Sequence, residues 1–443
     1  MDRADDYIEF SKATPTPFHA VREITQRLER DGFLPIEPNG AWSFRGGERH
    51  YVIAPDQRTV IAFAVGHKAP SEAGFRILGS HTDAPDLRLK LNPVSEGCSV
   101  TRLHTQIHGG VLYRTWLDRP LDLGGMIYHL KRDSDGRVQD DPETGLPALE
   151  RHLVRANKPI AFIPELAIHL DRKVNSEGKI NPEEQLVAVL GSGEQDPLLA
   201  QLSELLGHDL RTASGFDLHL FPFQDPVRVG VDGSIILGPR HDDLAMCWAS
   251  CEALRASVQQ CPDSDRTRVG YFVDAEEVGS MTSSGAQSSF LRHTLLRITR
   301  QHAAYGESGH QAEAAFQASL VVSADMAHAQ HPNHPTKHAA GHAPQINHGI
   351  TIKTNANERY ASTGETSALF RGLCEKAGVA FQEFVTRQDM GCGSTIGPIV
   401  AAGLGARTVD VGIPMWGMHS TFESCGVDDL NDAVLVFTQH YSS

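Results

Sequence analysis

The sequence lacks the features of a secreted or membrane-spanning protein. Its first residues, MDRADDYIEF, are acidic and contain no basic segment followed by an apolar stretch, so they do not resemble a signal peptide. No uncharged apolar run approaches the ~20 residues that a membrane-spanning helix needs. The seven cysteines include no C-x-x-C pair, which suits a reducing compartment. We therefore expect a cytoplasmic protein that does not bind membranes.

An excess of basic charge is also missing. Lysine and arginine number 40 against 55 aspartates and glutamates, which gives a formal net charge of −15. Binding to a phosphate backbone needs a basic footprint, so no nucleic-acid partner is expected. Because the whole chain repels anions at long range, an acidic substrate requires a local cation.

The chain has 443 residues, enough for two domains. Residues 1–92 contain a helical apolar pattern followed by two strand-like runs, and strands and helices alternate through residues 232–443. Such alternation predicts an α/β fold, a mixed sheet with helices on both faces. Residues 93–231 are instead rich in glycine and short strand-like segments, with one helical stretch expected at about 183–206. We interpret them as an inserted β-rich domain.

Acidic and imidazole side chains recur where an apolar run stops. His81 follows the run RILGS, and Asp325 follows LVVSA. In open α/β sheets, ligand sites lie beyond the carboxyl ends of the strands, so we expect such residues to converge. The full set is His81, Asp242, Glu277, Asp325 and His419, with Glu276 beside Glu277.

Single members of this set also have structural interpretations. Asp242 precedes an apolar helix, where it fits a helix cap, and His419 fits a buried, hydrogen-bonded histidine. The adjacent carboxylates of Glu276 and Glu277 repel each other at the end of an apolar strand. A structural role therefore explains the two glutamates less well than a chemical one.

Together, the two histidines and three carboxylates are too many ligands for one catalytic zinc. They fit two metal ions if one carboxylate bridges, and such ions polarise a carbonyl and lower the pKa of a bound water. Glu276, which we expect to point away from Glu277 along the strand, is then free to act as general base. Asp83 lies two positions after His81, on the same face of an extended chain, and we predict that it orients the His81 ring.

Nine segments, in order, resemble the aspartyl aminopeptidases, a family of cytosolic di-zinc exopeptidases. The segments are GSHTDAPDLRLK, YRTWLDRPLDLGG, IPELAIHL, the Asp242 region, DAEEVGS, SADMAHAQHPN, KTNANERYAS, GCGSTIGPI and GMHS. The resemblance implies a zinc-exopeptidase-like fold, an inserted dimerisation domain and a homododecamer built from dimers. It also implies that the substrates are peptides with an N-terminal Asp or Glu.

The same resemblance implies roles for individual residues. Asp242 is the bridging ligand and Glu276 the base; the ions are Zn²⁺, with Mn²⁺ or Co²⁺ possible at one site. The other implied ligands are His81, Glu277, Asp325 and His419. The implied substrate contacts are His169, His328, Lys353 and Tyr360.

The sequence departs from the family pattern at three places. Glu165 stands where the family has histidine, and His241-Asp242-Asp243 replaces a more usual apolar-Asp-Asn. Thr421-Phe422 stands where an aliphatic residue and arginine are expected. We expect these changes to affect the surroundings of the metal ligands and the subunit contacts rather than the ligands themselves.

Two other functions remain open from the residues alone. One is a di-metal deacylase or carboxypeptidase with the same ligand set. The other is a non-catalytic metal-binding assembly protein that uses the histidine-rich segment 328–348. A structural metal site has no use for a glutamate beside a ligand glutamate, so the pair Glu276 and Glu277 favours an enzyme.

Overall fold

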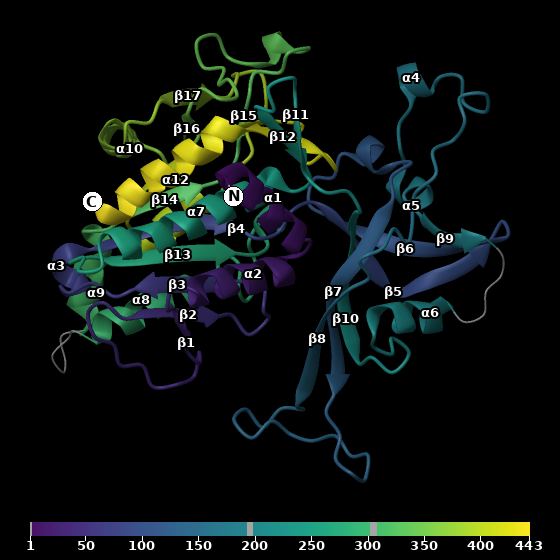
Figure 1. Ribbon diagram of the computed structural model, residues 1–443, viewed down its shortest axis with the longest axis horizontal. Coiled ribbons are helices and arrows are strands. Elements are labelled where there is room, and N and C mark those ends of the chain that lie inside the picture. The colour runs from purple at the N-terminus through teal and green to yellow at the C-terminus, as the bar shows by residue number, and fades with distance from the viewer. Residues whose placement is uncertain (1, 193–197, 302–307) are drawn as a thin grey trace. The chain divides into compact units, whose positions relative to one another are not determined.

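The chain forms two units in the computed structural model, which describes residues 2–192, 198–301 and 308–443 (Figure 1). The first unit comprises Met1–Ala84, Pro226–Met418 and Phe422–Ser443. The second comprises Pro85–Asp225 and His419–Thr421. The domain limits expected from the sequence, 1–92 with 232–443 and 93–231, remain a prediction.

The first unit is built on a nine-stranded sheet with the order β1-β2-β3-β13-β4-β14-β18-β16-β17. Four neighbouring central strands, β13, β4, β14 and β18, run parallel; Val273 pairs with His81 and Ser323 with Gly79. Parallel neighbours end at one edge, so the residues that follow them meet there. The strands are β1 (Leu34–Pro35), β2 (Arg49–Ile53), β3 (Val60–Ala64), β4 (Phe75–His81), β13 (Thr267–Val273), β14 (Leu320–Ala324), β16 (Ile350–Thr354), β17 (Phe381–Val385) and β18 (Arg407–Gly412).

Helices cover both faces of this sheet, because its strands are apolar on both sides. Phe272 of β13 packs into the core on one face, while its neighbours Tyr271 and Val273 pack into the core on the other. On the Phe272 face lie α1 (Arg3–Ala13), α2 (Pro17–Glu29), α7 (His241–Gln260), α10 (Gly364–Ala377) and α12 (Val427–Ser442). On the opposite face lie α8 (Phe290–Arg300), α9 (Ser308–Gln317) and α11 (Ile396–Leu404). The predicted α/β fold with helices on both faces is confirmed; Figure 1 shows α7 and α12 side by side along the sheet.

A smaller five-stranded sheet in the first unit has the order β11-β12-β20-β19-β15. Its strands are β11 (Val227–Val229), β12 (Ile235–Gly238), β15 (Ala327–His328), β19 (Pro414–Trp416) and β20 (Glu423–Gly426). The strand β15 follows shortly after Asp325, and β12 ends just before α7. This sheet therefore holds the chain shortly after Asp325 and shortly before α7.

The second unit contains a six-stranded antiparallel sheet with the order β8-β7-β10-β5-β6-β9. Its strands are β5 (Asp86–Gly97), β6 (Val100–His108), β7 (Leu121–Leu130), β8 (Leu149–Arg155), β9 (Ala188–Ser192) and β10 (Gly215–Pro222). Its helices are α4 (Val174–Glu177), α5 (Pro182–Gln185) and α6 (Leu198–Leu206). The α6 residues Leu202 and Leu206 pack against this sheet in an apolar core that includes Trp116 and Leu220.

The prediction of a single helix at about 183–206 is wrong. Within that range the chain forms the end of α5, then β9, and later α6; residues 193–197 lie outside the described part of the chain. The strand β9 forms because it pairs with β6, a partner much earlier in the sequence, with Ala188 opposite Leu103. Long-range pairing of this kind overrides a local helical pattern.

Within the described residue ranges, no helix has both the length and the apolar composition that crossing a membrane requires.

Candidate metal centre

The predicted ligands of the first unit lie at the carboxyl edge of the parallel strands. His81 is the last residue of β4, and Asp325 directly follows β14. Glu276 and Glu277 lie in a short 3₁₀ helix, η2 (Glu276–Val278), that follows β13. Three adjacent strands therefore deliver an imidazole and three carboxylates to one edge of the sheet.

Asp242 approaches the same edge from the start of α7. Its backbone N–H donates to Glu423 Oε2 at 3.0 Å, and its Oδ1 lies 3.4 Å from His81 Nε2. Both Asp242 and Asp243 depart from helical geometry, and the peptide bond between them is cis. The side chains of both aspartates lie near the His81 ring.

Two groups of side chains in this unit bring potential metal-ligating atoms within 4.8 Å of one another. The first group is His81, Asp242, Asp243 and Asp325, and the second is His81, Glu276 and Glu277. Asp243 was not among the predicted ligands. The only sign of Asp243 in the sequence was that a carboxylate replaces the amide usual in the family. In the structure, Asp243 Oδ2 also accepts a hydrogen bond from the His81 backbone N–H at 3.0 Å.

The expectation that Glu276 and Glu277 alternate along a strand is wrong. Ala275 has a φ of 67°, in the left-handed region, and turns the chain out of β13 into η2. The backbone N–H groups of both glutamates then point to one acceptor, Asp83, at 3.1 Å from Oδ1 and 3.3 Å from Oδ2. As a result, both glutamate side chains lie near His81.

Asp83 also contacts the His81 ring. His81 Nδ1 lies 3.0 Å from the Asp83 carbonyl oxygen and 3.5 Å from its Oδ1. Because a carbonyl oxygen only accepts, Nδ1 carries a hydrogen, so in the neutral ring the lone pair is on Nε2, the nitrogen that faces Asp242. That tautomer is the one in which Nε2 can bind a metal ion.

The carboxyl groups of this cluster have raised pKa values. Burial, followed by repulsion from neighbouring carboxylates, raises the pKa of Glu276 to about 8 and that of Asp325 to about 6. Burial also raises the pKa values of Asp243 and Glu277 well above their ordinary range. Crowded carboxylates with an imidazole form a donor set that suits Zn²⁺ and related divalent ions, whose charge relieves the repulsion.

Lys353, on β16, is buried beside Asp325. Its Nζ donates to the carbonyl oxygens of Asp325 at 2.8 Å and Met326 at 3.2 Å, and lies 3.7 Å from Asp325 Oδ1. The same ammonium is 5.2 Å from the centre of the Tyr360 ring, within the range of a cation–π contact. Lys353 therefore helps to fix the segment that carries Asp325.

Two of the predicted substrate contacts, His328 and Tyr360, line a cavity of about 250 Å³ in the first unit. The ring of Phe384 contacts both of them, with centroid distances of 5.6 Å to His328 and 6.4 Å to Tyr360. Lys337 and Arg387 also line the cavity. It thus combines aromatic surface with two cationic side chains.

The remaining predicted site residues, His169 and His419, belong to the second unit. His169 is exposed. His419 has a φ of 69°, and its Nδ1 lies 3.0 Å from the carbonyl oxygen of Gly110. Their roles in substrate and metal binding remain predictions.

His241, one of the departures from the family pattern, is accommodated by hydrogen bonds. Its Nε2 lies 3.3 Å from the Ile236 carbonyl oxygen, and its Nδ1 hydrogen bonds with the Tyr7 hydroxyl. Burial lowers the pKa of His241 to about 4, so the ring is neutral at physiological pH. A neutral, hydrogen-bonded imidazole replaces an apolar side chain here without leaving a buried polar atom unpaired.

Comparison with known proteins gives the family. The profile described as "Aminopeptidase I zinc metalloprotease (M18)" matches residues 10–441. The chain belongs to the M18 family of zinc aminopeptidases. Curated relatives named "Probable M18 family aminopeptidase 2", from Pseudomonas putida (strain GB-1) and Pseudomonas aeruginosa (strain UCBPP-PA14), are 40% and 39% identical to it; each alignment covers 98% of this chain and 97% of the relative.

Solved M18 structures have the same fold. One, titled "Cryo-EM structure of the Ape4 and Nbr1 complex", superposes with a TM-score of 0.92 at 31% identity and covers 99% of this chain and 85% of its own. The Saccharomyces mApe1 dodecamer superposes with a TM-score of 0.84 at 25% identity and covers 99% and 96%. The predicted resemblance, zinc-exopeptidase-like fold and zinc aminopeptidase class are therefore confirmed.

Proposed function

We propose that this M18 aminopeptidase removes an N-terminal Asp or Glu from peptides at a centre of two divalent metal ions. The observation that carries the proposal is the convergence of His81, Asp242, Asp325 and the two glutamates of η2 at one buried edge of the sheet. The proposed ligands are His81, Asp242 as the bridge, Glu277, Asp325 and His419. Zn²⁺ is the proposed metal, with Mn²⁺ or Co²⁺ possible at one site.

Bound metal ions supply Lewis-acid polarisation of the scissile carbonyl and lower the pKa of water. In this chain, Glu276 takes the proton from the attacking water and transfers it to the leaving amine. Asp83 supports this role because its carboxylate accepts the backbone N–H groups of Glu276 and Glu277. The same residue orients His81 through Nδ1.

Substrate recognition is proposed for His328, Lys353, Tyr360 and His169. The cavity lined by His328 and Tyr360 supports a binding pocket for the first side chain of the peptide. A formal net charge of −15 repels an acidic peptide at long range, so a fixed local cation is needed. Lys353, held beside Asp325 and Tyr360, is the proposed cation.

A comparison of four peptide types tests this function. Release of the first residue is measured from peptides that begin with Asp or Glu, with Ala or Leu, and from the same peptides with acetylated N-termini. We expect rapid release from free Asp and Glu termini and none from acetylated peptides. Release of acetate, or of the last residue, from the blocked peptides would instead support the deacylase or the carboxypeptidase, and preference for neutral termini would contradict the acidic specificity.

Substitution of Lys353 by methionine tests the source of that specificity. A charge-assisted bond is worth about 1.5–3 kcal/mol, so Lys353→Met should lower kcat/KM on Asp and Glu termini roughly 10- to 150-fold. Ala and Leu termini should be little affected. Lys68→Met, which removes an exposed ammonium that pairs with Asp265 and does not line the cavity, is the control. Equal losses on all substrates, together with loss of metal, would mean that Lys353 acts only by holding Asp325.

A further part of the proposal concerns self-association. The solved mApe1 relative is a dodecamer, and we propose a homododecamer built from dimers through the second unit. Around His169, the apolar side chains of Leu166, Ile168 and Leu170 are 49%, 50% and 76% exposed. Exposed apolar side chains in one short segment favour contact with another chain. A cytoplasmic location also remains a prediction.

A further inference from the structure

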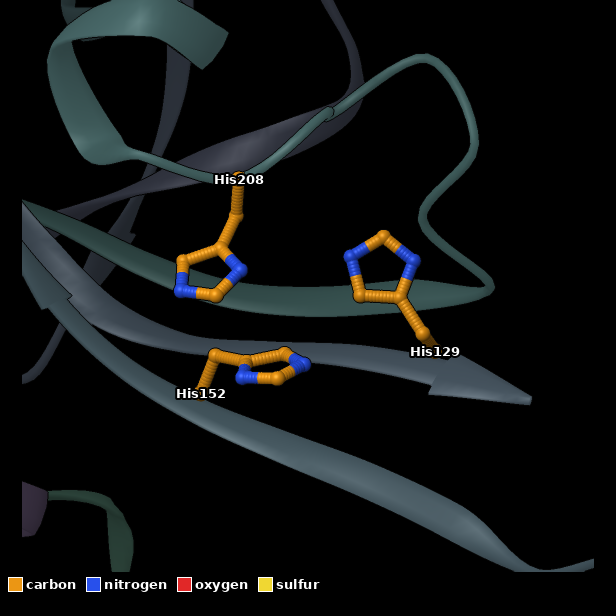
Figure 2. A group of neighbouring side chains, drawn as sticks. All are labelled: His129, His152 and His208. Carbon is orange, nitrogen blue, oxygen red and sulfur yellow. The ribbon is translucent and has the colours of Figure 1, made fainter. Parts of the chain in front are cut away.

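Three histidines of the second unit, none of which has been assigned a role above, lie together. His129 is on β7, His152 is on β8, and His208 follows α6 (Figure 2). The centroids of the His152 and His208 rings are 4.0 Å apart, and that of His129 is 5.5 Å from His152. All three side chains are partly buried.

The antiparallel register explains why two of them meet. Ile127 lies opposite His152, and His129 lies opposite Glu150. His129 and His152 are therefore diagonal neighbours on one face of the β7–β8 pair, where long side chains reach each other. Figure 2 shows both rings directed to the same region above these strands.

The turn after α6 brings the third histidine. Gly207 has a φ of 73°, in the left-handed region, and the His208 N–H donates to the Ser203 carbonyl oxygen at 3.0 Å. This is a common way for a helix to end at glycine. It reverses the chain so that the His208 ring stacks on His152, with an angle of 25° between the ring planes.

The ring nitrogens of this cluster are available to bind a ligand. Each of the three histidines offers a nitrogen, and these nitrogens all lie within 4.8 Å of one another. Within the described part of the chain, no protein group hydrogen bonds to the ring nitrogens of His129 or His208. Burial, and then the neighbouring imidazoles, lower the pKa of His208, which favours the neutral form that binds metals.

We propose that His129, His152 and His208 bind a transition-metal ion such as Zn²⁺, at a site separate from the aminopeptidase centre. Three neutral imidazoles suit zinc, copper or nickel, whereas Ca²⁺ and Mg²⁺ require oxygen ligands. Three protein nitrogens leave a fourth position of a tetrahedral zinc ion to water or another ligand. The bound ion would connect the β7–β8 pair to the turn after α6.

The surroundings of the three histidines and the partial exposure of their rings are compatible with a bound metal ion. Glu150 Oε2 lies 3.9 Å from His152 Nε2, too far for a hydrogen bond, and adds a carboxylate beside the cluster. In a tetrahedral zinc site the nitrogens are about 3.3 Å apart, given Zn–N bonds of about 2.0 Å. The rings therefore have to rotate inward from the stacked arrangement, and their partial exposure leaves room for such rotation.

Zinc binding by the full-length protein tests the proposal. Wild type and a His129→Gln, His152→Gln double variant are loaded with Zn²⁺, freed of unbound metal, and analysed for zinc per chain. The double variant should retain one zinc fewer. His293→Gln, which changes an exposed histidine of α8, should retain the wild-type amount. Equal zinc content in all three proteins would overturn the proposal.

A measurement on wild type alone covers the case in which the variant fails to fold. Acylation of histidines by diethyl pyrocarbonate is mapped by mass spectrometry with and without Zn²⁺. Zinc should lower the labelling of His129, His152 and His208 together, because a nitrogen whose lone pair is bound to a metal ion cannot be acylated. Labelling of His293 should not change. Unchanged labelling of the three histidines would also overturn the proposal, whatever metal the aminopeptidase centre holds.

Discussion

At the scale of single residues, Asp83 joins several parts of the candidate metal centre. It accepts hydrogen bonds from the backbone of Glu276 and Glu277 and contacts the His81 ring. It is fully buried. Its position just after β4 thus couples one strand end to the chain segment that follows β13.

Replacement of Asp83 by asparagine should weaken metal binding without unfolding the protein. The amide NH₂ would face a backbone N–H donor, so one hydrogen bond is lost and η2 shifts. Changes to groups that orient metal ligands typically lower metal affinity by about 10- to 100-fold, and a loss in that range is expected in a chelator-competition titration. Asp263→Asn, at an exposed position, is the control and should bind metal like wild type. Equal affinities for all three proteins would contradict the role of Asp83.

At the scale of elements, the end of β14 depends on the absence of a side chain in β18. A Cβ atom at Gly412 would lie 1.8 Å from the Asp325 carbonyl oxygen. The Asp325 N–H meanwhile donates to the neighbouring Val411 carbonyl oxygen at 2.9 Å. The backbone of Asp325 is therefore held tightly against β18.

Gly412→Ala should displace Asp325 and lower the metal content per chain. The clash is with backbone atoms, which cannot move aside as a flexible side chain does, so we also expect a lower melting temperature. Gly403→Ala on α11 is the matched control, because a Cβ atom at Gly403 would have no atom of another part of the chain within 4 Å. If Gly412→Ala kept the wild-type metal content, the position of Asp325 would not depend on this close strand contact.

The sequence predicted the fold where local periodicity and global packing agree. The apolar strands β4, β13 and β14 and the helix α7 are examples, since each packs in the layer that its pattern indicates. It failed where a distant partner decides the structure. The strand β9 exists because β6 pairs with it, and no local pattern in residues 183–206 indicates that.

The candidate site was predictable to a similar extent. Residues at strand ends, such as His81 and Asp325, followed from the rule for open α/β sheets. The orientation of Glu276 did not, because a left-handed residue, Ala275, turns the chain into a 3₁₀ helix there. The cluster of His129, His152 and His208 was also missed, since its members lie on three segments that only tertiary structure brings together.

At the scale of the whole molecule, the buried carboxyls should make the metal-free protein less stable as the pH rises. The pKa of Glu276 is raised from 4.5 to about 8, and that of Asp325 from 3.8 to about 6. The folded state then holds protons that the unfolded state has released. The stabilisation that these bound protons give is complete below the pKa values that the two groups have in the unfolded chain. It is lost as the pH rises through about 6 for Asp325 and about 8 for Glu276.

Denaturant unfolding of metal-free protein between pH 6 and pH 8, the range bounded by these two pKa values, measures this effect. Wild type should lose more free energy of unfolding across the range than Glu276→Gln, which has no proton to release at that position. Added Zn²⁺ should reverse the loss at the higher pH, because it binds the ionised carboxylates. The same slope in both proteins would show that Glu276 has no raised pKa in the metal-free state.

The central claim is that the carboxyl edge of the sheet is a metal centre in which adjacent glutamates have different tasks. Metal content per chain and turnover of a peptide with N-terminal Asp, measured on Glu276→Gln and Glu277→Gln side by side, test it most directly. Glu276→Gln should keep wild-type metal and lose roughly 10²–10⁴-fold in turnover, as expected for a general base. Glu277→Gln should lose both metal and turnover. Equal metal loss in the two variants, or full turnover in Glu276→Gln, would contradict the account.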